Sequence, residues 1–281
     1  MVIIKNSNIS VEISEYGAEI RRVTVNGEER FYNGNPQFWK GVAPILFPIC
    51  GALKDDTFTV DGKSYTLPKH GFARNSVFEV ERSEETRAVF LLKSDDETKK
   101  SYPWDFELRI LFELDGMDIK IGCEVKNLSE STMYTAVGFH EAYLCSEGIE
   151  DYDIIFEKTE TLKAHPVVGT LISRETETIL ENSNTLHLLN DYFTTDALVF
   201  TDIKSRFVTL KNRKTGKTVS VSFNGFDYFL IWTVPNAPFV CIEPWTTCPA
   251  FVDTKYDITK KEGMTPVSSG DTFRKEHTIH F

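Results

Sequence analysis

The clearest hydrophobic pattern in the chain is an alternation of apolar and polar residues over positions 106–125. Apolar side chains occupy every second position over 106–114 and again over 117–125, with Asp115 and Gly116 between the two runs. A period of two residues is typical of strands that bury one face, and Asp-Gly between two such runs indicates a tight turn. The sequence therefore predicts a long β-hairpin with a type I′ turn at Asp115-Gly116.

Shorter alternations of the same kind recur along the chain beside turn dipeptides. These dipeptides are Asn26-Gly27, Asp61-Gly62 and Thr215-Gly216. No window of about 12 residues or more carries the apolar stripe of a core helix. Residues 170–185 are too polar for more than a short helix or an irregular excursion, and the mixed charges of residues 93–100 suit a solvated loop. We therefore expect an all-β, antiparallel protein in which residues 1–281 form a single domain.

The composition fits a large core and argues against several classes of function. Hydrophobic residues make up 41% of the chain, which supplies enough apolar material for a folded domain. The formal net charge of −11 would repel a phosphate backbone, so we expect no nucleic-acid partner. Aromatic residues make up 12% of the chain, and they favour strands and offer flat faces for sugar rings.

No segment of the sequence predicts a membrane anchor or a disulfide framework. The apolar stretch near the N-terminus, residues 2–4, is too short for a signal peptide, and no later stretch approaches a membrane span. The five cysteines are scattered, odd in number and without CxxC spacing. We therefore expect a cytoplasmic protein with reduced, inert thiols, no membrane contact and no zinc site.

Three short segments place an ionisable residue inside an apolar or glycine-containing run. They are residues 69–75 (KHGFARN), 136–143 (AVGFHEAY) and 238–245 (PFVCIEPW). An ionisable residue in such surroundings is either paired in the core or lines a pocket. Glu243 is the clearest of them, because four hydrophobic neighbours make a solvated face hard to accept. We expect His70, His140 and Glu243 to converge on one open cleft.

These segments resemble the three signature segments of the aldose 1-epimerase superfamily, and most closely its LacX-like branch. Further matches, at residues 47–48, 196–200 and 231–232, keep the same order, so the resemblance runs from about residue 15 to the C-terminus. The resemblance implies a galactose mutarotase-like super-sandwich of antiparallel strands with a shallow sugar cleft on one sheet. It also implies an isomerase in which Glu243 is the base, His140 is the acid and His70 holds the sugar.

The chemistry of anomer exchange accounts for the same residue types. The C1 hydroxyl must lose a proton and the ring oxygen must gain one, so that the ring opens and can close on the other face. One base and one acid suffice, and positioned groups of this kind contribute about 10²–10⁴-fold each. No metal or cofactor is needed, and the one close histidine pair, His277 and His280, suits a closing strand better than a ligand set.

Two further residues are candidate sugar-binding groups. Arg74 could bind a sugar hydroxyl or a phosphate, or could pair with an acidic neighbour. Asp196 could contact sugar hydroxyls or could only end a turn. For Trp245 we predict a position in the hydrophobic core rather than a role as a stacking platform for a sugar ring.

The sequence departs from the family pattern at two positions. Relatives carry an arginine where this chain has Ala52, and Lys54 or Arg74 could replace it. Glu141 follows His140 where a proline is common. If Glu141 lay close to the imidazole, it would raise the pKa of His140.

The sequence leaves three functions open. The first is a mutarotase acting on a free hexose, the second a hexose-6-phosphate mutarotase, and the third a non-catalytic sugar-binding or regulatory protein on the same fold. A hexose-6-phosphate mutarotase needs at least two cationic groups around the phosphate, and Arg74 is the only obvious one in the sequence. The third draws support from Ala52 and is opposed by the presence of both Glu243 and His140. In each case we expect a small sugar as partner and a monomer or homodimer.

Overall fold

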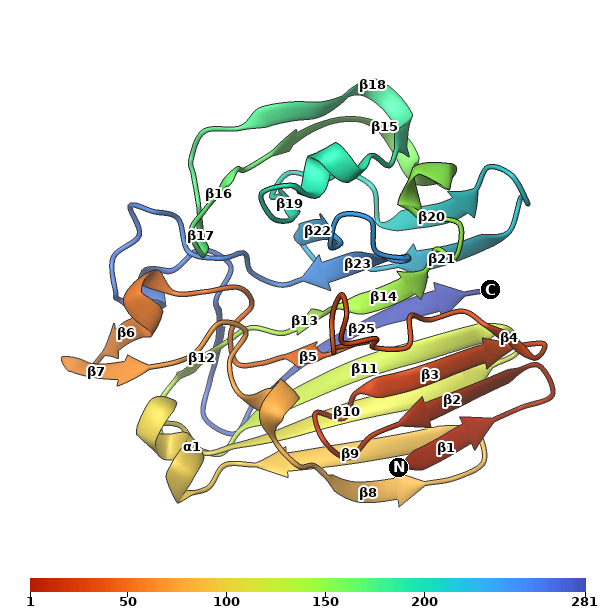
Figure 1. Cartoon of the computed structure of the whole chain (residues 1–281). Coiled ribbons are helices and arrows are strands. Elements are labelled where there is room, and N and C mark those ends of the chain that lie inside the picture. Colours follow the sequence, from red (N-terminus) through yellow and green to blue (C-terminus); the bar gives the residue numbers. More distant parts are fainter.

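The computed structural model describes all 281 residues and consists mainly of antiparallel strands, with one short helix (Figure 1). A nine-stranded sheet has the order β18 (Glu177–His187), β15 (Tyr152–Ala164), β20 (Phe207–Asn212), β21 (Thr218–Ser222), β25 (Thr272–His280), β11 (Asp118–Asn127), β10 (Phe106–Asp115), β9 (Arg87–Lys93) and β8 (Glu79–Ser83). A six-stranded sheet contains β19 (Leu198–Phe200), β22 (Tyr228–Trp232), β23 (Phe239–Trp245), β13 (Gly138–Phe139) and β5 (Ile45–Leu46), with β14 (Glu141–Leu144) paired to β23. The prediction of an all-β, antiparallel fold is confirmed.

Smaller elements complete the chain. A four-stranded sheet contains β1 (Val2–Lys5), β2 (Ile9–Ile13), β3 (Ile20–Val25) and β4 (Glu28–Glu29). Three strand pairs join β6 (Thr57–Val60) to β7 (Lys63–Thr66), β12 (Met133–Thr135) to β24 (Thr265–Val267), and β16 (Val167–Val168) to β17 (Leu171–Ile172). The helical elements are α1 (Asp96–Ser101) and the 3₁₀ turns Lys54–Asp56, Ala73–Asn75, Ile149–Asp151, Asn190–Phe193 and Ile258–Lys260. None of the helices has the length and apolar character that a membrane crossing needs.

The long hairpin is confirmed, but its turn differs from the prediction. Strands β10 and β11 pair up to Asp115 and Asp118, which leaves Gly116 and Met117 as the loop. Of these two, only Gly116 has a positive φ, of 61°. A type I′ turn needs positive φ at both central residues, so this loop has the pattern of type II′. The two central residues of the turn are therefore Gly116 and Met117, one position later than the predicted Asp115 and Gly116.

Two segments expected to be irregular are regular in the structure. Residues 177–187 form β18, an edge strand whose side chains are mostly exposed and which pairs with β15 through several register shifts. Exposure on both faces explains why this strand lacks an alternating pattern. Residues 96–101 form α1, whose first turn is capped because the Thr98 amide donates to the Asp95 carboxylate at 2.7 Å and the Asp95 amide donates to Thr98 Oγ1 at 2.8 Å.

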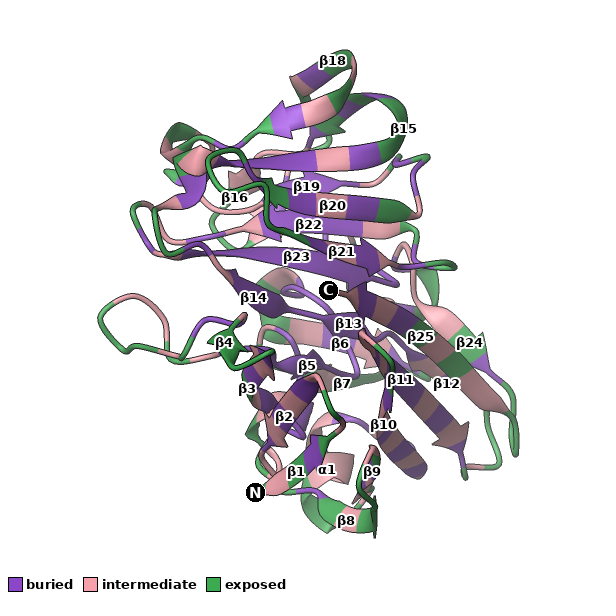
Figure 2. Ribbon diagram, turned by 90° about the vertical axis from the view of Figure 1, so that its right-hand side faces the viewer, coloured by how far each residue is buried: buried purple, intermediate pink, exposed green.

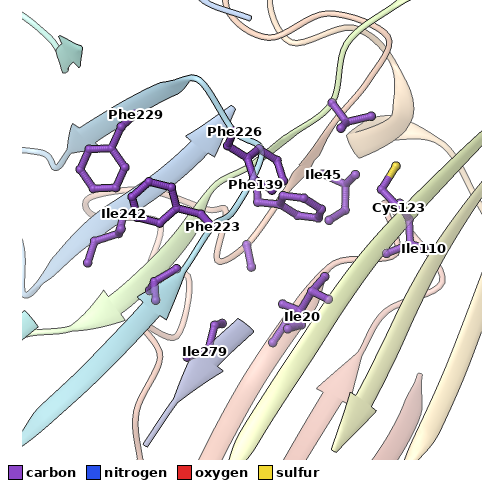
Figure 3. Packing of buried hydrophobic residues seen from close by; sticks show 14 of the residues in the cluster. Ile20, Ile45, Ile110, Cys123, Phe139, Phe223, Phe226, Phe229, Ile242 and Ile279 are labelled. Atoms are coloured by element: carbon purple, nitrogen blue, oxygen red, sulfur yellow. The ribbon is translucent and has the colours of Figure 1, made fainter. Parts of the chain in front are cut away.

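The six-stranded sheet is buried on both faces, and this double burial creates the site. All seven residues of β23 are buried, as the continuous purple of this strand in Figure 2 shows. Val240 and Ile242 belong to the main core, while Cys241 and Trp245 belong to smaller clusters on the other face. Figure 3 shows Ile242 within the main core, a cluster of 64 buried residues drawn from all the larger sheets.

A buried contact between two ionisable side chains links the two main sheets through this core. The carboxylate of Glu141 on β14 lies 3.1 Å from Nε2 of His277 on β25, and both side chains are at most 1% exposed. The contact lacks hydrogen-bond alignment, and the second Glu141 oxygen and the Tyr143 hydroxyl also have no partner. Each member of the pair is therefore the main polar neighbour of the other.

We predict that replacing His277 alone is more damaging than replacing both members of this pair. The substitution His277→Leu leaves Glu141 buried without its partner, which should lower the free energy of unfolding by about 3–5 kcal/mol. The double variant Glu141→Leu/His277→Leu should lose less, because two apolar side chains need no partner. Urea unfolding measures both, with His280→Leu as the control because His280 pairs with Asp118 near the surface. Equal losses in the single and double variants would contradict the prediction.

Candidate active site

A cavity of about 440 Å³ opens on the outer face of the six-stranded sheet. Its lining includes all five residues that the sequence singled out: His70, Arg74, His140, Asp196 and Glu243. They come from segments that are far apart in the chain, and the sheet brings them to one place. The expected convergence of His70, His140 and Glu243 on one cleft is confirmed.

Glu243 and His140 lie in contact on the floor of the cavity. Glu243 is the fifth residue of β23, on the face opposite Ile242, and His140 occupies the break between β13 and β14. The distance between Nε2 of His140 and Oε2 of Glu243 is 3.4 Å, with side-chain exposures of 10% and 1%. Neither Nδ1 of His140 nor Oε1 of Glu243 has a hydrogen-bond partner. Both groups therefore contain a buried polar atom that no other part of the protein satisfies.

Burial moves the pKa values of the two groups in opposite directions. It raises the pKa of Glu243 well above its usual value, and the negative charges of Glu141 and Asp196 add to this, while Lys69 opposes it. It lowers the pKa of His140 to about 3, helped by the positive charges of Lys69 and Arg74. Two such groups in contact titrate as a pair. The pair therefore carries a single proton over a wide range of pH.

The condition under which Glu141 would raise the pKa of His140, a position close to the imidazole, is not met. Successive residues of a strand point to opposite faces, so Glu141 points into the core and contacts His277. Burial then dominates at His140, and its pKa falls rather than rises.

His70 is held in place by a reciprocal contact with Gly51. The His70 amide donates to the Gly51 carbonyl at 2.8 Å, and the Gly51 amide donates to Nδ1 of His70 at 3.1 Å. Because Nδ1 accepts, the ring proton of the neutral imidazole is on Nε2. Burial lowers the pKa of His70 well below its usual value, which keeps the ring neutral. His70 itself has a φ of 70°, in the left-handed region.

Arg74, Lys69 and Asp196 form the charged part of the lining. Arg74 donates from Nη2 to the carbonyl of Lys69 at 3.0 Å, and its buried Nε has no partner. Arg74 forms no ion pair with a carboxylate, although the negative charge of Glu19 opposes the lowering of the Arg74 pKa by burial. Lys69 Nζ lies 3.9 Å from Oδ2 of Asp196, whose Oδ1 accepts from the amide of Ala197 at 2.8 Å. Asp196 thus both caps a local turn and faces the cavity.

Aromatic side chains form a wall that the sequence analysis missed. The Trp39 ring stacks on His140 with a centroid distance of 4.9 Å, and Trp232 meets the same imidazole edge-on at 5.5 Å. Trp39 lies in an irregular stretch between β4 and β5, where the adjacent aromatic residues Phe38 and Trp39 were the available signal. Trp245 is packed in a hydrophobic cluster, as expected, and also lines the cavity.

The position of the missing arginine is occupied by a buried residue outside the lining. Ala52 is 1% exposed, and its carbonyl accepts from the amide of Ala250. Of the two suggested replacements, Arg74 lines the cavity, whereas Lys54 lies over the ring of Tyr256. Lys69, which the sequence analysis treated only as a neighbour of His70, is a second cation in the lining.

The site contains one group of side chains with metal-binding atoms. Donor atoms of His140, Cys241 and Glu243 all lie within 4.8 Å of one another, and all three residues are buried. Three of the other histidines, His165, His187 and His280, have hydrogen-bond partners elsewhere in the structure.

Comparisons with known proteins agree on the relationship. The sequence model described as aldose 1-epimerase matches residues 1–254. The chromosomal protein LacX of Lactococcus lactis is 33% identical, over 98% of this chain and 97% of its own length. A galactose mutarotase related enzyme from Lactobacillus acidophilus has a TM-score of 0.94 at 32% identity, covering 99% of this chain and 96% of that one. A galactose mutarotase-like protein from Lactobacillus casei has the same TM-score at 26% identity, covering 100% and 99%. This chain therefore belongs to the aldose 1-epimerase family and has the galactose mutarotase-like fold.

Proposed function

We propose that this protein interconverts the α and β anomers of a free hexose by acid–base ring opening. The observation that carries the proposal is the contact between Glu243 and His140 at 3.4 Å, with pKa values moved in opposite directions inside a cavity. Pairs of ionisable groups whose environments separate their pKa values are typical of acid–base sites. A protein that only bound a sugar would need neither the raised pKa of Glu243 nor the lowered pKa of His140.

In the proposed reaction, Glu243 removes the proton of the C1 hydroxyl while His140 gives a proton to the ring oxygen. The bond between C1 and the ring oxygen breaks, the C1–C2 bond rotates, and the aldehyde is attacked on its other face. Closure reverses both proton transfers, so no atom or electron is gained or lost. Burial favours the proton on Glu243 in the free protein, and Nε2 of His140 is 3.4 Å away. Sugar hydroxyls that hydrogen-bond to the carboxylate would favour the proton on His140.

The remaining lining residues would hold and orient the sugar. His70 offers a fixed Nε2–H donor, Arg74 a guanidinium and Asp196 a carboxylate, and these are complementary to ring hydroxyls. Trp39 and Trp232 offer apolar faces against which a pyranose ring can pack. No cofactor or metal is required by this reaction. A cytoplasmic location, a single domain over residues 1–281 and a monomeric or homodimeric state stay predictions.

A second candidate function has one observation in its favour. Lys69 and Arg74 both line the cavity, so two cationic groups are available for a hexose 6-phosphate rather than the one found in the sequence. The proximity of Asp196 to Lys69 opposes this, because the carboxylate offsets part of the lysine charge. We therefore favour the free hexose.

We predict that Glu243→Gln lowers the rate at least about 10²-fold, since the amide cannot accept the C1 proton. Sugar binding should survive, because the amide still forms hydrogen bonds. Optical rotation of freshly dissolved α-D-glucose and α-D-galactose measures the rate, and a melting curve shows whether the variant is folded. Glu177→Gln, an exposed substitution on β18, is the control. Full activity in a folded Glu243→Gln protein would remove this residue from the mechanism.

The pH profile of the reaction provides an independent test. The pair takes up a second proton only as pH falls toward the pKa of His140, about 3, and loses its single proton as pH rises through the elevated pKa of Glu243. Activity should therefore persist well below pH 6.5, the ordinary imidazole value, and decline on the alkaline side. The rate above the spontaneous background, measured across pH, shows this. An acid limb near pH 4.5, the ordinary carboxyl value, together with an alkaline limb near pH 6.5 would indicate two independent groups instead.

Inorganic phosphate distinguishes the two substrate classes. If the substrate is a free hexose, phosphate should leave the rate nearly unchanged, and kcat/KM should be higher for hexoses than for their 6-phosphates. Lys69→Met should then alter the two classes to a similar extent. Competitive inhibition by phosphate, with a loss in Lys69→Met confined to 6-phosphates, would favour the second candidate.

A further inference from the structure

The acid–base pair has a third neighbour that the proposed reaction does not use. Cys241 precedes Glu243 by two residues on β23, so both side chains point to the cavity face of the sheet. The thiol is fully buried, and it pairs in register with Trp232 on β22 and Ala142 on β14. Its sulfur lies within 4.8 Å of donor atoms of His140 and Glu243. Nitrogen, sulfur and oxygen donors thus meet on one face of the sheet, beside the cavity that His140 and Glu243 line.

The spacing of these donors suits a small tetrahedral ion. Two ligands bound to Zn²⁺ at about 2.1 Å in tetrahedral geometry are about 3.4 Å apart. The observed distance between Nε2 of His140 and Oε2 of Glu243 is 3.4 Å. Side-chain shifts of about 1 Å would bring the thiol to the same ion at a bond length of about 2.3 Å. Glu243 Oε1 and His140 Nδ1 have no partners, so the two side chains are not fixed by hydrogen bonds at these atoms.

The charges of these donors suit a divalent cation. A thiolate, a carboxylate and a neutral imidazole together carry two negative charges, so a bound divalent ion gives a neutral assembly. Neutrality matters here because all three side chains are buried, and a net charge would be costly in such surroundings. Thiolate and imidazole favour Zn²⁺ and related ions over Mg²⁺ or Ca²⁺, which prefer oxygen ligands.

We propose that His140, Cys241 and Glu243 bind Zn²⁺ or a similar soft divalent cation, and that this ion inhibits the protein by occupying its acid–base pair. Three protein ligands leave the fourth tetrahedral position for solvent or another ligand. The bound ion would displace the proton of the thiol and the single proton of the pair, and both would pass to solvent. Binding therefore strengthens as pH rises. The inhibitory effect rests on the proposed function, whereas the binding does not.

Cobalt provides a test of binding that needs no turnover. Co²⁺ bound by a thiolate in a tetrahedral site gives a thiolate-to-metal absorption band and intense visible bands. We expect these bands on titrating the whole protein with Co²⁺, and their loss on adding Zn²⁺. In Cys241→Ser the thiolate band should disappear, and Zn²⁺ affinity in calorimetry should fall at least about tenfold. Cys123→Ser is the matched control, because Cys123 is an equally buried thiol in the other sheet.

Inhibition is measured by the rotation assay on the same proteins. Zn²⁺ should inhibit the wild type and Cys123→Ser, a chelator should restore the rate, and Cys241→Ser should need at least about tenfold more Zn²⁺. Melting curves check folding, and Cys241→Ala replaces the serine variant if that one is unstable. Absence of the cobalt bands, or equal Zn²⁺ affinity in wild type and Cys241 variants, would overturn the metal site. Cobalt bands in a protein without mutarotase activity would keep the site and reject the proposed function instead.

Discussion

The structure depends on one constraint: a carboxylate and an imidazole are in contact within a sheet that is covered on both faces. Strand β23 has no exposed residue, so Glu243 cannot reach bulk solvent and its proton is governed by its neighbours. The apolar residues on the opposite face, such as Ile242, fix the strand against the main core. The packing of the apolar residues on the core face of the sheet thereby holds Glu243 in the buried position that raises its pKa.

The sequence predicted the parts of the fold in which burial alternates with position. Hairpin β10–β11 is the clearest case, because one face of each strand is buried along its whole length. Strand β18 was missed because it lies at a sheet edge with few buried side chains, so pairing rather than hydrophobicity determines its conformation. The type of the turn at Gly116 was missed because it depends on which residues of the two strands pair with each other. The residue types at the turn do not determine that register.

The candidate site was predictable where an ionisable residue interrupts an apolar run, as at Glu243 and His140. Trp39 and Lys69 were missed because they lie outside regular strands, and only the folded chain brings them to the cavity. The effect of Glu141 on His140 could not be predicted from the sequence for a different reason. Adjacency in the chain does not determine proximity of side chains, and Glu141, at the start of β14, contacts His277 in the core, whereas His140 lines the cavity.

The backbone conformation of His70 is unfavourable for a histidine, although the imidazole lines the candidate site. A residue with a φ of 70° is favoured as glycine or asparagine, and Gly71 beside it has no room for a side chain, since an added Cβ would lie 2.1 Å from the Phe47 carbonyl oxygen. A histidine here carries conformational strain, and its ring and backbone amide are held by the two hydrogen bonds with Gly51. A search for thermostable variants that ignored activity would therefore be expected to replace His70 early.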